Sequence, residues 1–305
     1  MRTSDLTKLG TEQSNTASVD LDTKSALEIA RIMNAEDARV PKAVSEVLPQ
    51  IAKVIDLVAE AIRRKGRLIY VGAGTSGRIG ALDASECPPT FNTDPKTVRY
   101  IIAGGSKALG AAVEPNEDSA KLGRKDIAKL KPTTKDVIVG IAASGRTPYT
   151  IGACEYARKK GARTACIVCN TGSPLAGVVE VPIEVDVGPE VIAGSTRLKA
   201  GTAQKLVCNM ITTGAMTRLG DIFGNLMVNV HLKNEKLVER GVGIVQKATG
   251  VEREQALAAL KAANTHVPVA ILMLKASLSA KKAAKRLRDA NGNLRRAIGS
   301  SKTES

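Results

Sequence analysis

Two short segments combine glycines with hydroxyl side chains directly after apolar, strand-like runs. The first is LIYVGAGTSGR, which contains Thr75 and Ser76, and the second is VIVGIAASGRTPY, which contains Ser144 and Thr147. Glycine lets a backbone approach a ligand closely, and hydroxyl groups bind anions together with the free amides that open a helix. The two segments therefore predict a pair of phosphate-binding turns, which would suit a phosphorylated sugar.

Nucleotide binding is the main rival interpretation of these turns. Gly72, Gly74 and Gly77 match the spacing G-x-G-x-x-G, but that fingerprint also requires an acidic residue about 20 positions on. Here the next expected strand, VRYIIA, ends in Gly104 and Gly105. A Walker A loop is excluded because no Gly-Lys-Ser/Thr follows either turn. A third interpretation stays open, in which the glycines only permit tight strand-to-helix turns.

Two glutamates are candidates for acid–base chemistry. Glu86 lies at the far end of the helix that the first turn opens, and Pro88 is expected to end that helix at Cys87. The helix dipole disfavours a negative charge at such an end, which hints at a proton donor. Glu117 lies within AVEPNEDS, after the glycines of the next strand end. The simpler alternative is that Glu117 belongs only to the first turn of a helix over 118–130.

Alternating strand and helix patterns position these residues. Apolar runs predict strands near 67–72, 98–103, 137–142, 164–169 and 183–187, with helices between them. This alternation predicts an α/β fold with a doubly wound parallel sheet, which binds ligands at the carboxyl ends of its strands. Both hydroxyl-rich turns lie at such ends.

Helical patterns flank the sheet on both sides in the sequence. A long helix is predicted over 195–219, with Ser195 or Thr196 as its N-cap. Three short helices are predicted near 252–263, 267–276 and 280–290. The expected organisation is an N-terminal arm, an α/β domain that includes the N-terminal helices, a small helical module and a tail, over residues 1–20, 21–244, 245–299 and 300–305.

Composition is that of a soluble globular protein without a structural metal. The 305 residues are 43% hydrophobic and 25% charged, and no apolar stretch approaches the roughly 20 residues of a membrane-spanning helix. The N-terminus has no apolar signal region, so a cytoplasmic protein is expected. Five cysteines are too few and odd in number for a disulfide framework. Cys166 and Cys169 lie within a predicted strand, where they would be small buried residues.

The net charge of +15 raises the question of nucleic-acid binding. Aromatic residues make up only 2% of the chain and Trp is absent, so no platform for base stacking is evident. The densest basic run, 281–296, alternates with an apolar stripe at helical spacing, Ala283, Ala284, Leu287 and Ala290. We therefore predict a solvated helix face and no nucleic-acid partner. The positive charge would still attract an anionic sugar phosphate.

The motifs, taken together, resemble the N-acetylmuramic acid 6-phosphate etherase family, part of the wider sugar isomerase (SIS) group. The resemblance is carried by VGAGTSGRIGALDASECPPTF, IAASGRTPY, VGPEVIAGSTRLKAGTAQKLVCNM and TEQSNTASVDLD, and it spans about Thr11 to Ile298. It implies an SIS-type fold and a lyase of peptidoglycan recycling or catabolism. Such an enzyme releases D-lactate and N-acetylglucosamine 6-phosphate without a cofactor.

The resemblance also implies site residues. Its two catalytic glutamates correspond to Glu86 in DASE and Glu117 in AVEPNED, which differs from the family's AVEGAED at Pro115 and Asn116. The predicted substrate-binding residues comprise both turns and four positions that the resemblance adds: Gly74, Thr75, Ser76, Gly77, Ser144, Gly145, Arg146, Thr147, Glu190, Ser195, Arg197 and Lys199.

Two carboxyl groups are sufficient for the implied chemistry. One removes the C2 proton of the ring-opened sugar, and the other protonates the departing lactate oxygen at C3, after which water adds there. We assign Glu117 as the base and Glu86 as the acid, and we expect no metal. Two other functions stay open: a non-catalytic sensor similar to the glucokinase regulatory protein, and a sugar-phosphate isomerase.

A homodimer with a shared active site is also expected. The helices predicted over 25–65 and 196–219 carry more apolar positions than one contact with a sheet would need. The arm at 11–20 is rich in polar side chains that could reach a ligand. The family resemblance likewise implies a dimer of SIS domains.

Overall fold

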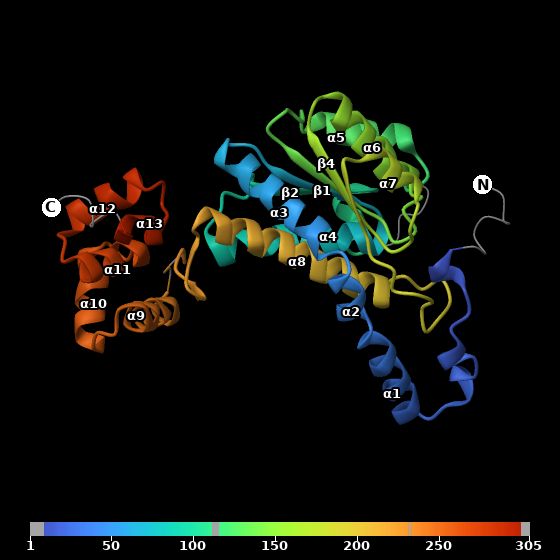
Figure 1. Ribbon diagram of the computed structural model, residues 1–305, viewed down its shortest axis with the longest axis horizontal. Helices are drawn as coiled ribbons and strands as arrows, with labels where there is room; N and C mark the ends of the chain where they lie inside the picture. The colour runs from blue at the N-terminus through green and yellow to red at the C-terminus, as the bar shows by residue number, and fades with distance from the viewer. Residues whose placement is uncertain (1–8, 112–115, 231, 233, 300–305) are drawn as a thin grey trace. The chain divides into compact units, whose positions relative to one another are not determined.

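The computed structural model describes residues 9–111, 116–230, 232 and 234–299, which form two compact units (Figure 1). The first unit comprises Met1–Ser85 and Pro95–Thr212, and the second comprises Glu86–Asp94 and Thr213–Ser305. This division differs from the domain boundary expected at 244/245. The reason is that helix α9 (Glu235–Thr249) packs against α10 and α11 in the second unit, with Val242 and Val245 in that unit's core.

The first unit is built on a five-stranded parallel sheet, which confirms the predicted fold class. Its strands are β1 (Leu68–Gly72), β2 (Val98–Ile102), β3 (Val137–Ile141), β4 (Arg163–Val168) and β5 (Val181–Glu184). They lie in the order β2-β1-β3-β4-β5. The direction of winding reverses between β1 and β3, and such a switch point is where doubly wound sheets bind ligands.

Helices cover both faces of this sheet (Figure 1). The helices α5 (Ala120–Lys129), α6 (Pro148–Lys159) and α7 (Pro174–Val178) share one apolar core with alternate residues of β1, β3 and β4. On the other face lie α3 (Leu48–Arg63), which contacts β1, β3 and β5, and α8 (Lys199–Leu219). Burial on both faces explains why the strands are continuous apolar runs.

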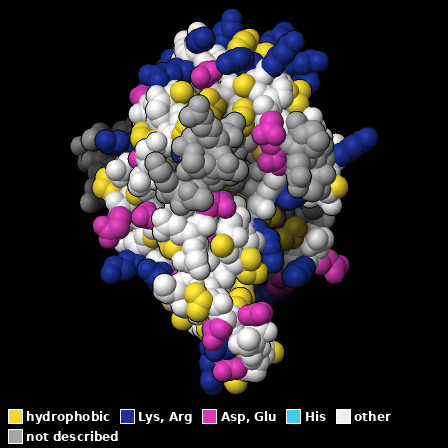
Figure 2. All heavy atoms as spheres, turned by 90° about the vertical axis from the view of Figure 1, so that its right-hand side faces the viewer, with side chains coloured by type: hydrophobic (Ala, Val, Ile, Leu, Met, Phe, Trp, Pro, Cys, Tyr) yellow, Lys and Arg dark blue, Asp and Glu magenta, His cyan; other side chains and the backbone are white. Residues whose placement is uncertain are grey.

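Lysine and arginine side chains gather on the upper surface in Figure 2, over the region where α5 and α6 lie in Figure 1. Helix α5 carries four exposed basic residues, Lys121, Arg124, Lys125 and Lys129. Two of the four pair with acidic side chains of the same two helices, Arg124 with Glu155 and Lys129 with Asp126. This basic region is therefore a solvated helix face.

The N-terminal arm is tied to the segment between β5 and α8. The Gly194 amide donates to the carbonyl oxygen of Thr11 at 3.0 Å, and the Ser18 hydroxyl donates to that of Val191 at 2.8 Å. Three 3-10 turns, Gly10–Glu12, Thr16–Ser18 and Leu21–Thr23, lead into the helices α1 (Ala26–Asp37) and α2 (Val40–Ser45). The predicted N-terminal arm thus contains 3-10 turns over its described residues.

The second unit is a helical module preceded by a short hairpin, β6 (Ile222–Phe223) and β7 (Leu226–Met227). The three predicted short helices are confirmed as α10 (Arg253–Ala262), α11 (Val267–Ala276) and α12 (Ala280–Asp289). As predicted, Ala283, Leu287 and Ala290 of the basic run are buried. α13 (Leu294–Gly299) ends the described chain, so the predicted tail at 300–305 lies outside it.

Two predicted helix boundaries were wrong, the end of α4 and the start of α8. Helix α4 (Gly74–Phe91) does not stop at Cys87 but continues through Pro88 and Pro89, and the Asn92 amide donates to the Pro88 carbonyl at 2.9 Å. Buried Cys87 and Phe91 keep the apolar face of this last turn in the core, which outweighs the local preference. Helix α8 begins at Lys199 instead of Ser195 or Thr196.

Three general features concern the cysteines, membrane-spanning helices and metal-binding groups. All five cysteines are buried and unpaired by disulfides, and burial raises the pKa of the Cys166 thiol to about 12. Within the described ranges, no single helix is both long and apolar enough to cross a bilayer; α10 and α11 reach that length only together, bent by 115°. The described residues also contain no group of three or more His, Cys, Asp or Glu side chains arranged to hold a metal ion.

Candidate active site

The two hydroxyl-rich turns lie beside each other at the switch point of the sheet. The first turn follows β1 and opens α4, and the second follows β3 and opens α6. Because β1 and β3 are adjacent and parallel, with Gly72 opposite Ile141, the turns leave the same edge of the sheet. The sequence had predicted each turn, and the structure brings the two together.

The first turn requires glycine at three positions. Gly74 has a left-handed backbone with φ of +50°. A Cβ on Gly77 would lie 2.6 Å from Cγ1 of Ile102, and one on Gly72 would lie 2.8 Å from the Gly77 amide nitrogen. Close packing of the helix start against the strands therefore explains Gly72 and Gly77. Thr75 remains half-buried beside them.

The second turn is fixed by contacts of its backbone. Gly145 has φ of +66°, and a side chain there would collide with Ser173. The Arg146 amide donates to the Ser144 hydroxyl at 3.3 Å. The Arg146 Nε atom is buried and makes no hydrogen bond within the described part of the chain. Thr147 is the N-cap of α6, but its side chain makes no capping bond. Donors of this turn are thus available to an anion.

Glu117 lies between the two turns. Its carbonyl oxygen accepts a hydrogen bond of 3.0 Å from the amide of Tyr149, in the first turn of α6. Its carboxylate Oε1 is 3.2 Å from the position that a Cβ on Gly74 would occupy, at the start of α4. Arg78 of α4 holds the preceding loop by donating to the carbonyl of Ala108 at 2.9 Å. One carboxylate therefore lies at the switch point with both predicted phosphate turns.

The other predicted catalytic residue lies further along the same helix that carries the first turn. Glu86 is an exposed residue of α4 and belongs to the second unit. Pro115, at which the AVEPNED segment departs from the family pattern, lies outside the described residues, whereas Asn116 and Glu117 are described. That Glu86 acts with Glu117 stays a prediction.

Glu190 caps the helix α8. Its two carboxylate oxygens accept hydrogen bonds from the backbone amides of Lys199 and Ala200, both at 2.9 Å. These amides are unpaired within the helix itself, so the distant carboxylate takes the place of a local N-cap. This contact explains why α8 begins at Lys199. Burial raises the pKa of the Glu190 carboxyl, although both amide hydrogen bonds oppose that shift.

Lys199 is fully buried and pairs with a carboxylate of α1. Its Nζ lies 2.6 Å from Oε2 of Glu36, which also accepts a hydrogen bond of 2.8 Å from Asn15 of the arm. Arg39 donates to the other oxygen of Glu36 at 3.1 Å. Burial alone would raise the pKa of Glu36, but hydrogen bonds from Lys199, Asn15 and Arg39 outweigh burial and lower it to about 2.

The predicted sugar-side residues therefore fall into two groups. Glu190 and Lys199 have no exposed surface, and their polar groups are bonded within the protein. Ser195 is half-buried and Arg197 is exposed, in the segment that leads to α8. Direct contact between any of the four and a sugar stays a prediction. In this structure Glu190 caps α8 and Lys199 joins that helix to α1.

Sequence reasoning missed the buried polar partners on α8. Gln204 accepts a hydrogen bond of 3.0 Å from the Ser76 hydroxyl. Asp83 of α4 accepts hydrogen bonds from Tyr70, at 2.9 Å, and from Asn209, at 2.8 Å. Burial raises the pKa of the Asp83 carboxyl, against the effect of these bonds. The helical spacing of Gln204 could have indicated its burial. It lies four residues after Ala200 and four before Cys208, on the same buried face of the helix.

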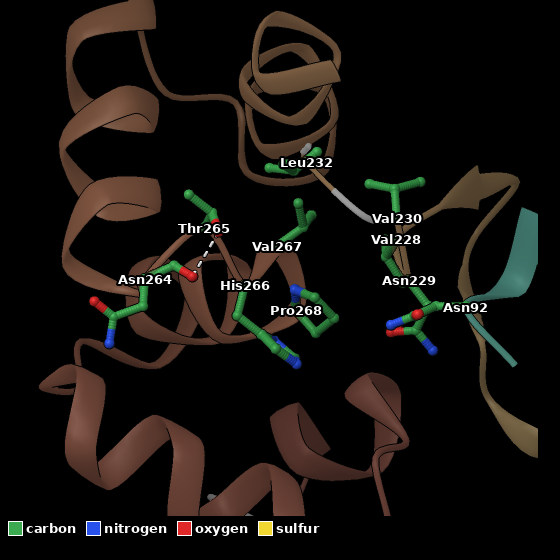
Figure 3. Close-up of a pocket in the computed structure, with 10 residues that line it drawn as sticks. All are labelled: Asn92, Val228, Asn229, Val230, Leu232, Asn264, Thr265, His266, Val267 and Pro268. Atoms are coloured by element: carbon green, nitrogen blue, oxygen red, sulfur yellow. Dashed lines mark hydrogen bonds between the residues drawn. The ribbon is translucent and has the colours of Figure 1, made fainter. Parts of the chain in front are cut away.

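The second unit contains a pocket of its own, with a volume of about 240 Å³ (Figure 3). In Figure 3 the side chains of Asn92 and Asn229 lie on one side, and His266 and Pro268 lie on the other. Apolar residues and the polar Asn264 and Thr265 complete the wall, and burial lowers the pKa of His266. None of the predicted site residues lines this pocket, whose lining residues are Asn92, Val228, Asn229, Val230, Leu232, Asn264, Thr265, His266, Val267 and Pro268.

Comparison with known proteins gives matches over nearly the whole chain. Two family models match: the glucokinase regulatory protein N-terminal SIS domain over residues 50–158, and the SIS domain over residues 129–214. The N-acetylmuramic acid 6-phosphate etherase of Photobacterium profundum is 52% identical over 298 residues, covering 98% of this chain and 99% of that protein. The etherase of Klebsiella aerogenes is 53% identical, covering 96% and 98%.

Among solved structures, a phosphoheptose isomerase from Neisseria gonorrhoeae superposes with a TM-score of 0.50 at 16% sequence identity. The superposition covers 63% of this chain and 100% of the isomerase. At this level of identity the likeness concerns the fold alone. It agrees with the parallel sheet and flanking helices described above.

Proposed function

The chain belongs to the N-acetylmuramic acid 6-phosphate etherase family, and we propose that it cleaves the D-lactyl ether of N-acetylmuramic acid 6-phosphate. The products are D-lactate and N-acetylglucosamine 6-phosphate, which makes the protein a carbon–oxygen lyase. The observation that carries this proposal is the position of the Glu117 carboxylate, 3.2 Å from the Cβ position at Gly74, at the sheet edge that also holds both hydroxyl-rich turns.

The reaction is an elimination followed by a hydration. In the open-chain sugar the C2 proton is α to the aldehyde, and Glu117 removes it as general base. The C3–oxygen bond then breaks, and Glu86 supplies the proton that the departing lactate oxygen needs. The resulting C2=C3 double bond is conjugated with the aldehyde. Water adds at C3 with Glu86 as base, and Glu117 returns a proton to C2.

Phosphate recognition positions the sugar for these steps. Thr75, Ser76, Ser144 and Thr147 supply hydroxyl donors, and the first amides of α4 supply backbone donors. Support comes from the half-buried position of Thr75, Ser144 and Thr147 at adjacent strand ends. The glycines Gly74 and Gly145, both with left-handed backbones, keep side chains out of this space.

The product that receives the oxygen atom of water distinguishes elimination from cleavage on the lactate side of the ether. We expect the reaction in heavy-oxygen water to label the C3 hydroxyl of N-acetylglucosamine 6-phosphate and to leave D-lactate unlabelled, as measured by mass spectrometry. Elimination requires this result because the original ether oxygen departs with lactate. Label in the lactate would show cleavage on its other side and would overturn the elimination.

A sugar-phosphate sensor is the second candidate, because the model of the glucokinase regulatory protein N-terminal SIS domain matches residues 50–158. A sensor needs the phosphate turns but neither glutamate. The same assay separates the two functions: a sensor binds the sugar phosphate and releases no D-lactate. An aldose–ketose isomerase would likewise release none.

We further propose a cytoplasmic homodimer whose active sites are shared between subunits. Exposed apolar side chains of the first unit support a protein contact, among them Leu82 of α4 at 52% and Met210 of α8 at 36% exposure. In the shared site that we propose, Glu117 of one copy and Glu86 of the other act on adjacent carbons of one sugar.

Subunit mixing tests this arrangement. Glu86→Gln and Glu117→Gln variants, each inactive, are unfolded together, refolded as a mixture and assayed for lactate. With shared sites, a mixed dimer has one intact site, so a 1:1 mixture recovers roughly a quarter of wild-type activity. Sites formed within single subunits would recover none. Light scattering checks the dimeric mass of each sample.

A further inference from the structure

Ser76 and Gln204 form a buried hydrogen bond that joins the predicted phosphate turn to α8. The Ser76 Oγ atom lies 3.0 Å from Oε1 of Gln204, and the two residues are only 9% and 1% exposed. The remaining polar atom of the amide, Gln204 Nε2, is buried and has no hydrogen-bond partner among the described residues. Helix α8 lies close to this turn, because a Cβ built at Gly201 would be 3.7 Å from Cγ2 of Thr75.

This arrangement is unfavourable for phosphate binding. A serine hydroxyl has one proton, and here Ser76 donates it to Gln204. A phosphate dianion only accepts hydrogen bonds, so Ser76 in this state offers it nothing. A buried donor without a partner, such as Gln204 Nε2, also costs about 1–3 kcal/mol.

A half-turn of the Gln204 amide gives Nε2 a partner and frees the Ser76 proton, while Oε1 takes the unpaired position that Nε2 held. The oxygen and the NH₂ group of a carboxamide have nearly the same shape, so the turn exchanges them without repacking. Nε2 then donates to the Ser76 oxygen, which has lone pairs to accept it. The Ser76 proton becomes free to point towards the phosphate at the start of α4.

We propose that Gln204 is a positioning residue that directs the Ser76 proton to the phosphate group of the substrate. This inference rests on the proposed function, because it assumes a sugar phosphate at the first turn. Gln204 itself does not touch the ligand; it acts through Ser76. An amide is compatible with both states because it can accept from Ser76 in the empty site and donate to it in the occupied one, whereas a carboxylate can only accept.

Two substitutions of similar size separate this role from packing. In Gln204→Glu the ionised carboxylate can only accept, so it keeps the Ser76 proton away from the phosphate. In Gln204→Met no hydrogen bond remains, and the Ser76 hydroxyl is free to turn. We expect affinity for N-acetylglucosamine 6-phosphate, measured by calorimetry, to fall about tenfold or more in Gln204→Glu, as for a lost hydrogen bond to a charged group. Gln204→Met should stay within about threefold of wild type.

Three further measurements complete the experiment. Gln50→Glu, in a half-buried glutamine of α3, should leave affinity unchanged. In a Ser76→Ala background, the difference in affinity between Gln204→Glu and Gln204→Met should become smaller, because no Ser76 hydroxyl remains to be oriented. Inorganic phosphate should repeat the same order of affinities, and far-ultraviolet circular dichroism confirms that each variant is folded.

The outcomes distinguish the inference from the proposed function. Equal weakening by Gln204→Glu and Gln204→Met would mean that Gln204 only fills space, and no weakening by either would mean that Ser76 does not donate to the phosphate. Both results overturn the inference, whether or not lactate is released. Because titration needs no turnover, a wild-type protein that binds phosphate but releases no lactate would refute the proposed function and leave the Gln204 test intact.

Discussion

The strand-end turns and the buried ionic cluster of the first unit use the same residue types for opposite purposes. At the turns, Glu117 and Ser144 are half-buried at the edge of the sheet where ligands bind. In the cluster, Glu36, Glu190 and Lys199 are almost fully enclosed, and their polar groups are bonded to one another or to backbone amides. A carboxylate therefore serves chemistry in one place and holds helices together in the other.

The difference lies in what surrounds each group. A buried charge is tolerated only when hydrogen bonds and an opposite charge replace water, and the cluster supplies both to Glu36. The turns instead keep donors such as Arg146 Nε without a partner in the described chain. We infer that activity and stability are separable, with substitutions at the turns changing catalysis and those in the cluster changing folding.

The sharpest test of this comparison is the catalytic pair. Glu117→Gln should lower lactate release by about 10²- to 10⁴-fold, as expected for a lost general base, and should also abolish exchange of the C2 proton with deuterated solvent. Glu86→Gln should stop lactate release but leave that exchange largely intact. Proton exchange is followed by nuclear magnetic resonance of the substrate.

The opposite pattern, with exchange lost in Glu86→Gln and kept in Glu117→Gln, would reverse the assigned roles. Neither variant should unfold more easily than wild type in urea, because Glu86 is exposed and Glu117 is half-buried. A large loss of stability in Glu117→Gln would place this residue with the cluster and weaken the comparison.

Much of the fold and part of the site followed from the sequence because they rest on local patterns. Buried parallel strands are continuous apolar runs, and glycine with hydroxyl residues after β1 and β3 predicted both turns. The pairing of Lys199 with Glu36 could not be predicted, since 163 residues separate them and only the tertiary fold brings them together. The Pro88 prediction was wrong for a related reason: tertiary packing of Cys87 and Phe91 overrides a local preference.

The second prediction concerns the stability of the cluster. Lys199→Met leaves Glu36 as a buried carboxylate without its lysine, and breaking a buried pair in this way costs about 3–5 kcal/mol. We expect the free energy of unfolding in urea to fall by that amount. The control is Lys129→Met, whose pair with Asp126 lies on the surface; it should change stability by less than about 1 kcal/mol. Equal losses of stability in Lys199→Met and Lys129→Met would show that burial does not make the first ion pair more important for folding than the second.

Acid should lower the stability of the protein through the same cluster of Glu36, Glu190 and Lys199. The pKa of Glu36 is lowered to about 2 from an ordinary 4.5. Its contribution to the free energy of unfolding is therefore complete above pH 4.5 and is lost as the pH falls towards 2. Glu190 works in the opposite direction, because its pKa is raised and its carboxylate becomes less costly as it protonates. Urea unfolding at several pH values should therefore show a flatter profile between pH 4.5 and 2 in Glu36→Gln than in wild type. Parallel profiles would contradict the assignment of that acid sensitivity to Glu36.

The smallest expected effect belongs to a single hydroxyl of the second turn. Ser144→Ala should raise KM for the sugar phosphate by about tenfold, since it removes one hydrogen bond to a charged group. It should leave kcat and the urea midpoint nearly unchanged, because Ser144 is half-buried and its one described side-chain bond is a long contact of 3.3 Å from the Arg146 amide. Ser45→Ala, on exposed α2, is the matched control and should leave KM unchanged. If Ser76→Ala and Ser144→Ala both left KM unchanged, the phosphate would bind away from these turns. The turns would then have no shown role in binding, and their contrast with the buried cluster would not be one of function.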